Sequence, residues 1–124
     1  MREAPMDRFR ADTYLPLTPV AFEVLLALAD GSRHGYSILQ EVEARSGGTV
    51  SLHAGTLYRA LARLLEQSLI EELDAPEGPG HEDERRRYYG ITERGVAVAR
   101  AEVARLESQL AAARSRRVLQ EQQA

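Results

Sequence analysis

The segment from residue 51 to residue 67, SLHAGTLYRALARLLEQ, limits the fold more than any other part of the chain. Its leucines recur at helical spacing and predict a helix with one buried face: Leu57, Leu61, Leu64 and Leu65. Ser51 is the expected N-cap of this helix. Arg59 and Arg63 are four residues apart, so they project together on the side opposite the leucines. Because no acidic residue lies between residues 52 and 65, the helix presents a locally positive surface.

Two further helices are predicted before this segment. LTPVAFEVLLALADG opens with Thr18 as N-cap and Pro19 at the first helical position, and Gly31 closes it. Apolar residues occupy nearly every side of this helix, as in a helix at the centre of a core or buried at a subunit interface. The preceding residues, 1–16, are polar with two prolines and are expected to form an N-terminal arm of uncertain order.

RHGYSILQEVEARSGG predicts the second helix, which Gly47 and Gly48 end. Its expected inward residues are Ile38, Leu39 and Val42, and its expected outward residues are Glu41, Glu43 and Arg45.

Two short strands are predicted after the leucine-rich helix. LIEEL forms the first strand and RRRYYGIT the second, and the segment between them forms a hairpin loop rich in Pro, Gly and acidic residues. Residues 71–84 contain seven acidic side chains and no Arg or Lys. Period-two alternation places Tyr89 and Ile91 toward the core and leaves Tyr88 as the more exposed ring. Thr92 is the expected cap of a last helix over residues 93–118, and residues 119–124 form a polar tail.

The order helix, helix, helix, strand, loop, strand, helix indicates a mainly α fold with a small β-hairpin. Three short helices followed by a hairpin are typical of a winged helix-turn-helix domain, here expected over residues 17–92. In such domains the third helix enters the major groove of DNA and the hairpin lies alongside it.

Three blocks of the chain resemble the PadR family of bacterial transcriptional regulators: HGYSI, GTLYRALARLLEQSLIEE and RRRYYGITERG. The resemblance extends from about Leu17 to the end of the last helix, and a single C-terminal helix resembles the short subgroup of this family. Two features depart from the family pattern. Ser68 stands where the family usually has Gly, at a position where Gly would adopt a positive φ cheaply. The hairpin loop is unusually acidic, which argues against a contact between its tip and the DNA backbone.

DNA contacts are expected from the second helix, from the third helix (the recognition helix) and from the base of the hairpin (the wing). The candidate residues are Tyr36, His53, Ala54, Gly55, Thr56, Tyr58, Arg59, Arg63, Arg85, Arg86 and Arg87. The first turn of a recognition helix usually meets base edges, and small residues there permit close approach. The resemblance favours phosphate contacts for the two tyrosyl hydroxyls, and the alternative is that their rings fill gaps between helices. The arginine cluster at residues 85–87 either reaches the phosphate backbone or neutralises the acidic loop beside it.

The last helix carries a heptad seam with spacing 3, 4, 3, 4, 3, made by Val96, Ala99, Val103, Leu106, Leu110 and Ala113. Charged residues flank it and are expected to pair across partners: Arg100, Glu102, Glu107, Arg114 and Arg116. A helix of this length exceeds what one small domain can cover, so we predict that residues 93–118 form the interface of a homodimer. The alternative is that the seam packs on its own domain. A homodimer would address a two-fold-related operator in double-stranded DNA.

The predicted function is therefore sequence-specific DNA binding that regulates transcription. The resemblance implies a repressor, and in some members relief by a small apolar or aromatic effector. The alternative is a dimeric winged-helix module that binds protein through its acidic wing and no longer binds DNA.

Composition excludes other classes. Without cysteine the chain can form neither a disulfide nor a thiolate metal site. Its three histidines are scattered, and it has neither a glycine-rich phosphate loop nor a nucleophile elbow, so we expect no enzyme activity, cofactor or metal. With a formal net charge of -3, DNA binding requires local basic clusters. The N-terminus lacks a signal-peptide run and no window is long and apolar enough for a membrane span, so a cytoplasmic protein with no membrane partner is expected.

Overall fold

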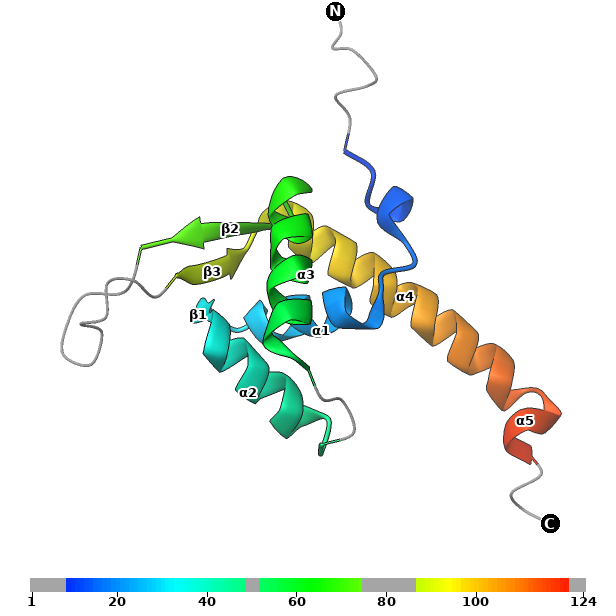
Figure 1. Cartoon of the computed structure of the whole chain (residues 1–124). Helices are drawn as coiled ribbons and strands as arrows, with labels where there is room; N and C mark the ends of the chain where they lie inside the picture. Colours follow the sequence, from blue (N-terminus) through cyan, green and yellow to red (C-terminus); the bar gives the residue numbers. More distant parts are fainter. Residues whose placement is uncertain (1–8, 49–51, 75–86, 121–124) are drawn as a thin grey trace, which may run out of the picture.

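A computed structural model describes residues 9–48, 52–74 and 87–120 of the chain. Its elements are the 3-10 helix η2 (Ala11–Tyr14), α1 (Pro19–Leu28), β1 (Arg33–His34), α2 (Gly35–Arg45), α3 (Ala54–Glu66), β2 (Ile70–Leu73), β3 (Tyr88–Ile91), α4 (Glu93–Arg114) and α5 (Arg117–Gln120). Figure 1 shows α1, α2 and α3 packed beside the sheet, with α4 running past α1 and out beyond the domain. This is a winged helix-turn-helix arrangement with a long C-terminal helix.

Helix α1 is the centre of the core, as its sequence predicts. It packs against α2, α3, α4 and β3. Val24, Leu25 and Leu28 are at most 1% exposed. The other helices turn their apolar faces toward it, with Ile38 and Val42 from α2 and Leu57, Leu61 and Leu64 from α3. The helical periodicity of the three segments therefore identified most of the buried faces.

Threonine side chains cap the starts of α1 and α4. The Thr18 hydroxyl accepts a hydrogen bond from the Ala21 amide at 3.1 Å, and the Thr92 hydroxyl accepts one from the Gly95 amide at 3.0 Å, as predicted. The expected Ser51 cap of α3 is wrong. Ser51 lies outside the described residues, and the N-cap residue is His53, whose side chain makes no capping hydrogen bond. The helix starts at Ala54, two residues later than expected, and Leu52 before it is buried in the core.

The sheet has three antiparallel strands in the order β1-β3-β2, one more than the predicted hairpin. The additional strand β1 is two residues long and pairs Arg33 with Tyr89 and His34 with Tyr88. Tyr88 is the more exposed of the two tyrosines, as predicted, since Tyr89 is 3% exposed, but it is buried as well. The Tyr88 ring is 8% exposed, because the His34 ring packs against it edge to face at 5.5 Å. Tyr89 is buried in the core, as expected.

Helices α2 and α3 end in the same C-terminal motif with different residues. After α2, the amides of Gly47 and Gly48 donate to the carbonyls of Ala44 and Glu43 at 3.3 and 3.0 Å. After α3, the amides of Ser68 and Leu69 donate to the carbonyls of Leu65 and Leu64, both at 3.0 Å. Both are Schellman motifs, in which one residue adopts a left-handed conformation. That residue is Gly47 with φ +66° in one case and Ser68 with φ +62° in the other, so Ser68 does occupy a glycine position.

The turn at Ser68 also joins the start of α4. The Thr92 hydroxyl donates to the Ser68 carbonyl at 2.7 Å, and the Thr92 amide donates to the Leu69 carbonyl at 3.1 Å. Gly95 packs against this backbone so closely that a Cβ there would collide with the Leu69 carbonyl oxygen. The end of α3, the start of β2 and the first turn of α4 thus meet at one junction.

The N-terminal segment is attached to α4. The 3-10 helix η2 packs against α4 (Figure 1), and the Phe9 ring lies 5.0 Å from the Arg94 guanidinium.

Glu102 of α4 is only 2% exposed and accepts two hydrogen bonds from Arg105, at 2.7 and 2.8 Å. The expectation that Glu102 pairs across a dimer is therefore wrong, because its carboxylate is buried in its own subunit.

Helix α4 is shorter than the predicted helix over residues 93–118. It ends at Arg114, and the short helix α5 follows after two residues. At the break, the Ser115 hydroxyl donates to the Ala112 carbonyl at 3.0 Å. A serine that bonds locally to the backbone competes with helix continuation, which explains the end of α4.

We predict that Ser68→Gly stabilises the protein. A side chain in the left-handed region is strained by about 1 kcal/mol, and glycine removes that strain, so the free energy of unfolding in urea should rise by about this amount. The matched control is Gly47→Ser in the equivalent motif of α2, which should lower the free energy of unfolding by a similar amount. If both variants unfold with the same free energy as wild type, neither position is strained.

We predict that Glu102→Gln lowers stability at pH 7 by about 1–3 kcal/mol, because a buried charged hydrogen bond is lost. The hydrogen bonds from Arg105 lower the pKa of Glu102, against the opposing effect of burial, and a bond from the Leu17 backbone adds to the lowering. A lowered folded-state pKa contributes stability that is present above the unfolded pKa and is lost as pH falls through the folded pKa. The wild-type protein should therefore lose more stability between pH 5 and pH 3 than the variant. Glu43→Gln, at an exposed position of α2, is the control and should leave this pH dependence unchanged.

Candidate nucleic-acid interface

The face of α3 opposite its buried leucines is exposed and holds most of the predicted recognition residues. His53, Ala54, Gly55, Tyr58, Arg59 and Arg63 are exposed, and Thr56 is half-buried. This arrangement follows from the periodicity, since Leu57, Leu61 and Leu64 take up the inward side. The structure brings these residues onto one surface, and their contact with DNA stays a prediction.

Three of these residues form a first-turn cluster: Gly55, Thr56 and Arg59. The Arg59 guanidinium lies 3.4 Å from the Thr56 hydroxyl. A Cβ on Gly55 would lie 3.5 Å from the same guanidinium, so Arg59 folds back over the start of the helix. Guanidinium donors suit guanine and phosphate, and a threonine offers a hydroxyl and a methyl group. The cluster therefore presents hydrogen-bonding groups at the end of α3 that usually meets base edges.

Arg63 lies at the other end of the exposed face. It borders a hollow of about 270 Å³ between α3, α1 and the N-terminal segment, which Tyr14 and Leu17 also line. Arg59 and Arg63 share a face as predicted, but Arg63 is a full turn further from the first-turn cluster.

The two predicted tyrosines project from different helices toward solvent. Tyr36 of α2 is 61% exposed and Tyr58 of α3 is 49% exposed. The Tyr58 ring lies directly over Gly35, the first residue of α2, and a Cβ there would be 2.9 Å from the ring carbon Cζ. The Tyr58 ring therefore packs between helices, as in one of the two alternatives, while half of its surface stays exposed, and its contact with a phosphate stays a prediction.

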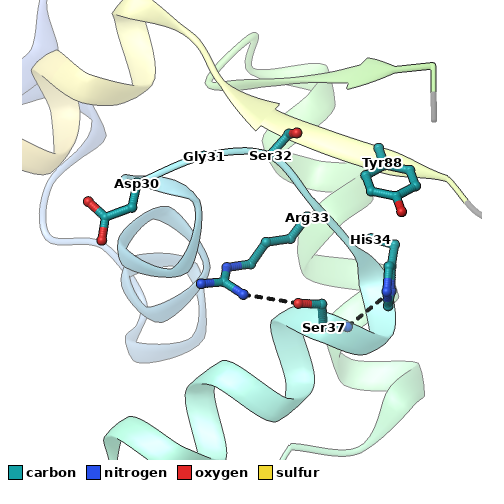
Figure 2. Close-up of a pocket in the computed structure, with 7 residues that line it drawn as sticks. All are labelled: Asp30, Gly31, Ser32, Arg33, His34, Ser37 and Tyr88. Carbon is teal, nitrogen blue, oxygen red and sulfur yellow. Dashed lines mark hydrogen bonds between the residues drawn. The ribbon is translucent and has the colours of Figure 1, made fainter. Parts of the chain in front are cut away.

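Hydrogen bonds hold the start of α2 in place. His34 Nδ1 accepts from the Ser37 amide at 3.2 Å, and Arg33 donates to the Ser37 hydroxyl at 3.0 Å. Figure 2 shows these residues around a hollow of about 370 Å³ between the α1–α2 turn and β3, with the Tyr88 ring facing His34. Because Nδ1 accepts this hydrogen bond, it carries no proton while it caps the helix.

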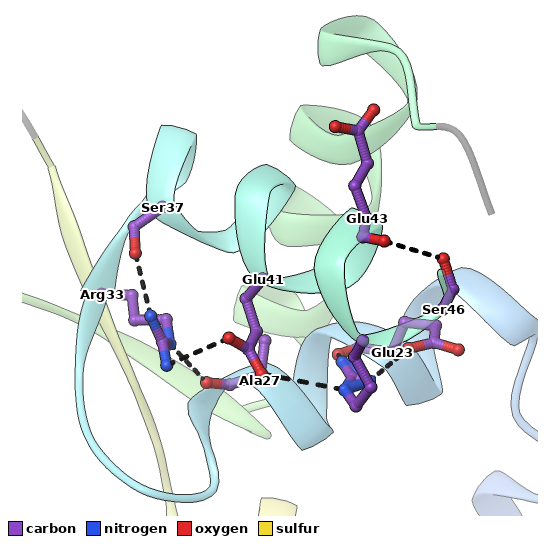
Figure 3. Close-up of polar contacts among 8 residues, drawn as sticks. Glu23, Ala27, Arg33, Ser37, Glu41, Glu43 and Ser46 are labelled. Carbon is purple, nitrogen blue, oxygen red and sulfur yellow. Dashed lines mark hydrogen bonds and ion pairs between the residues drawn. The ribbon is translucent and has the colours of Figure 1, made fainter. Parts of the chain in front are cut away.

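Charged side chains tie α2 to α1 (Figure 3). Arg33 donates to the Ala27 carbonyl at 2.8 Å and pairs with Glu41 at 3.5 Å. Arg45 pairs with Glu23 at 2.6 Å and also contacts Glu41 at 3.9 Å. These ion pairs link the two helices, and because their side chains remain 23–35% exposed, each pair adds little stability. The residues predicted to point outward from α2 therefore include two that hold it against α1.

The base of the wing pairs opposite charges. Arg87 is exposed and lies 3.1 Å from Glu72 of β2. This arginine therefore does neutralise an acidic residue of the wing, which is one of the two predicted alternatives. Arg85 and Arg86 lie outside the described residues. Burial, and then the nearby Glu72 carboxylate, raises the pKa of Tyr89, while Arg87 opposes this shift. The outward residues Glu71, Glu72 and Asp74 give β2 an acidic surface.

The heptad seam of α4 has two different halves. Val96 and Ala99 are half-buried, and Ala99 packs against the core of the domain. Val103, Leu106 and Leu110 are 40, 37 and 47% exposed, and Ala113 is half-buried. The intramolecular alternative thus holds for the first half, and the second half leaves large apolar side chains uncovered.

Sequence patterns missed strand β1, the Glu102 contacts and the reason for glycine at position 35. In the described ranges no group of three His, Cys, Asp or Glu side chains could hold a metal ion. Of the helices that the structure describes, none has the length and apolar character needed to cross a bilayer.

Comparisons with known proteins agree with this geometry. Residues 24–101 match the model of the transcriptional regulator PadR-like family. A transcriptional regulator from Clostridium thermocellum superposes with a TM-score of 0.67 at 23% identity, over 87% of this chain and 97% of that one. A PadR family transcription regulator from Clostridium difficile gives 0.66 at 20% identity, over 79% and 97%. Bacillus subtilis PadR in complex with operator DNA gives 0.59 at 20% identity, over 71% and 47%.

Two curated relatives are both uncharacterized. A protein from Lysinibacillus sphaericus is 32% identical over 60% of this chain, and a 37.1 kDa protein in a transposon of Streptomyces fradiae is 49% identical over 41%. The chain spans 65% and 14% of the lengths of these two relatives.

Proposed function

Because the chain belongs to the PadR-like family, whose members are transcriptional regulators and not enzymes, we propose that it binds double-stranded DNA through the exposed face of α3. The first-turn cluster of Gly55, Thr56 and Arg59 carries this proposal. It places donors and a small-residue surface at the start of the third helix of a winged helix-turn-helix, where base edges are read.

Phosphate contacts would come from the residues around this cluster. The exposed side chains of Tyr36 in α2 and Tyr58 in α3 offer hydroxyl donors. Contacts of this kind fix the register of a protein on DNA without reading its sequence. Arg63 and Arg87 would add charge, and Arg87 would have to exchange its Glu72 partner for a phosphate. Arg85 and Arg86 are proposed for the same role from their sequence position.

The protein would act as a homodimer through α4. A helix of 22 residues is about 33 Å long, and its second half exposes Val103, Leu106 and Leu110 on one side. Two chains paired along this stripe would bury it and would present two recognition helices to a two-fold-related operator. We further propose that the dimer represses transcription and that a small apolar or aromatic effector relieves the repression, on the basis of the family resemblance.

DNA binding is tested on a duplex from the promoter of the protein's own gene and on a scrambled duplex, over a salt series. Arg59→Ala should cost on the order of 1–3 kcal/mol on the promoter duplex and relax specificity, because a base contact is lost. Arg87→Ala should weaken binding to both duplexes alike and reduce the slope of log K against log salt by about 0.9, the value for one phosphate. Arg10→Ala, which removes an exposed arginine of the N-terminal segment that pairs only locally with Asp12, is the control and should match wild type.

The outcomes separate the alternatives. An unchanged salt slope in Arg87→Ala would mean that this arginine serves only Glu72. Absence of binding to either duplex by folded wild-type protein would favour the alternative function, a protein-interaction module that acts through the acidic surface of β2.

Dimerisation is tested by Leu106→Arg. If the stripe on α4 is an intersubunit contact, the variant buries a charge without a partner, and light scattering should show monomer or unfolded chain. Ser108→Arg places the same charge on another side of the same helix and should leave the dimer intact. A dimer of normal stability in Leu106→Arg would exclude the stripe as the interface.

A further inference from the structure

The contact between Gly35 and Tyr58 has a geometric cause. Gly35 is the first residue of α2 and is buried, while Tyr58 belongs to the second turn of α3. A Cβ on Gly35 would overlap the Tyr58 hydroxyl and would lie 2.9 Å from Cζ and 3.2 Å from Cε1. Carbon atoms do not approach side chains this closely, so the tyrosine ring occupies the space that any other residue at position 35 would need.

The usual reason for a glycine does not apply here. Gly35 does not have the positive φ of Gly47 and Gly48, so its backbone conformation is open to any residue. Glycine in a helix is less favourable than alanine by up to about 1 kcal/mol. The chain tolerates this cost at a position where the Tyr58 ring fills the space of a side chain, so that a substitution displaces the ring.

The support under the Tyr58 ring is rigid. The first turn of α2 is capped by His34 and held by the Arg33–Ser37 hydrogen bond, and Arg33 is in turn bound to the Ala27 carbonyl of α1. The ring rests on this turn, and 49% of the Tyr58 residue remains exposed. The hydroxyl is therefore placed at the junction of α2 and α3, next to the helix turn that carries Tyr36.

We propose that Gly35 is a positioning residue, which sets the Tyr58 hydroxyl at the place where it meets a DNA phosphate. This inference rests on the proposed function, in which Tyr58 contacts the DNA backbone. An O–H···O hydrogen bond requires a donor–acceptor distance of about 2.5–3.0 Å. A side chain at position 35 would force the ring off its support and would move the hydroxyl out of this range without touching DNA itself.

The test is a double-mutant cycle on DNA affinity with Gly35→Ala and Tyr58→Phe. Tyr58→Phe should weaken binding about tenfold, since a hydrogen bond to a charged group is lost. Gly35→Ala should cause a similar loss, and the double variant should lose little more than either single variant, because both changes remove the same contact. The salt slope should stay at the wild-type value in all variants, because an uncharged hydroxyl replaces no counterion. A folded Gly35→Ala protein with wild-type affinity, or losses that multiply in the double variant, would overturn the proposal.

Urea unfolding tests the contact independently of DNA. Gly35→Ala should stabilise a Tyr58→Leu background, where the ring is absent and alanine is the better helix former. In the wild-type protein it should give a smaller gain or a loss, because the half-exposed ring must move off its support. Gly55→Ala is the matched control: its Cβ would meet only an ordinary 3.5 Å contact, so it should be neutral or stabilising in both backgrounds. Destabilisation by Gly35→Ala in both backgrounds would show that the glycine is required for another reason. A failure of the proposed function can be told apart from a failure of this inference. In the first case the wild-type protein binds no duplex, and the unfolding measurements still show whether the Tyr58 ring and Gly35 are coupled.

Discussion

The junction at Ser68, Leu69 and Thr92 is the contact on which the rest of the architecture depends. Backbone and hydroxyl groups of these residues join the end of α3 to the start of α4 by hydrogen bonds of 2.7 and 3.1 Å. Strand β2 begins at the same point, so one small set of main-chain groups orients the recognition helix, the wing and the long helix together. Backbone-to-backbone contacts of this kind leave little room for side chains, which explains Gly95 in the first turn of α4.

The charge distribution resolves the apparent conflict between an acidic chain and a DNA-binding proposal. The formal net charge of -3 is spread unevenly. Glu23, Glu41 and Glu102 are engaged by Arg45, Arg33 and Arg105 within the domain, and the acidic residues of β2 lie on the wing. The exposed face of α3 carries Arg59 and Arg63 and no acidic residue before Glu66. Local charge near a helix face, more than net charge, decides which molecules approach that face.

Sequence patterns predicted the features that depend on local periodicity and failed where distant residues decide. The buried faces of α1, α2 and α3 follow from apolar spacing, and the Thr18 and Thr92 caps follow from residue type next to a helix start. The burial of Tyr88 was missed because β1, two residues long, carries no pattern of its own and covers the ring from another part of the chain. Glu102 looked like an exposed heptad flank, since nothing near it in the sequence reveals its contact with the Leu17 backbone. Ser68 was the opposite case, because a departure from a family glycine correctly indicated a left-handed residue.

Because α4 is long, a small change of its direction at the attachment point displaces its far end by several ångströms. A helix about 33 Å long that pivots by about 10° moves its free end by roughly 6 Å. In the proposed dimer the two recognition helices must match half-sites about 34 Å apart, so a displacement of this size would be felt as a change of register on the duplex. The Ser68–Thr92 contact holds the start of α4 at the end of α3 opposite the first-turn cluster, and α1 and η2 also pack against this helix. Substitutions there could retune the spacing of the operator while leaving every base-reading side chain as it is.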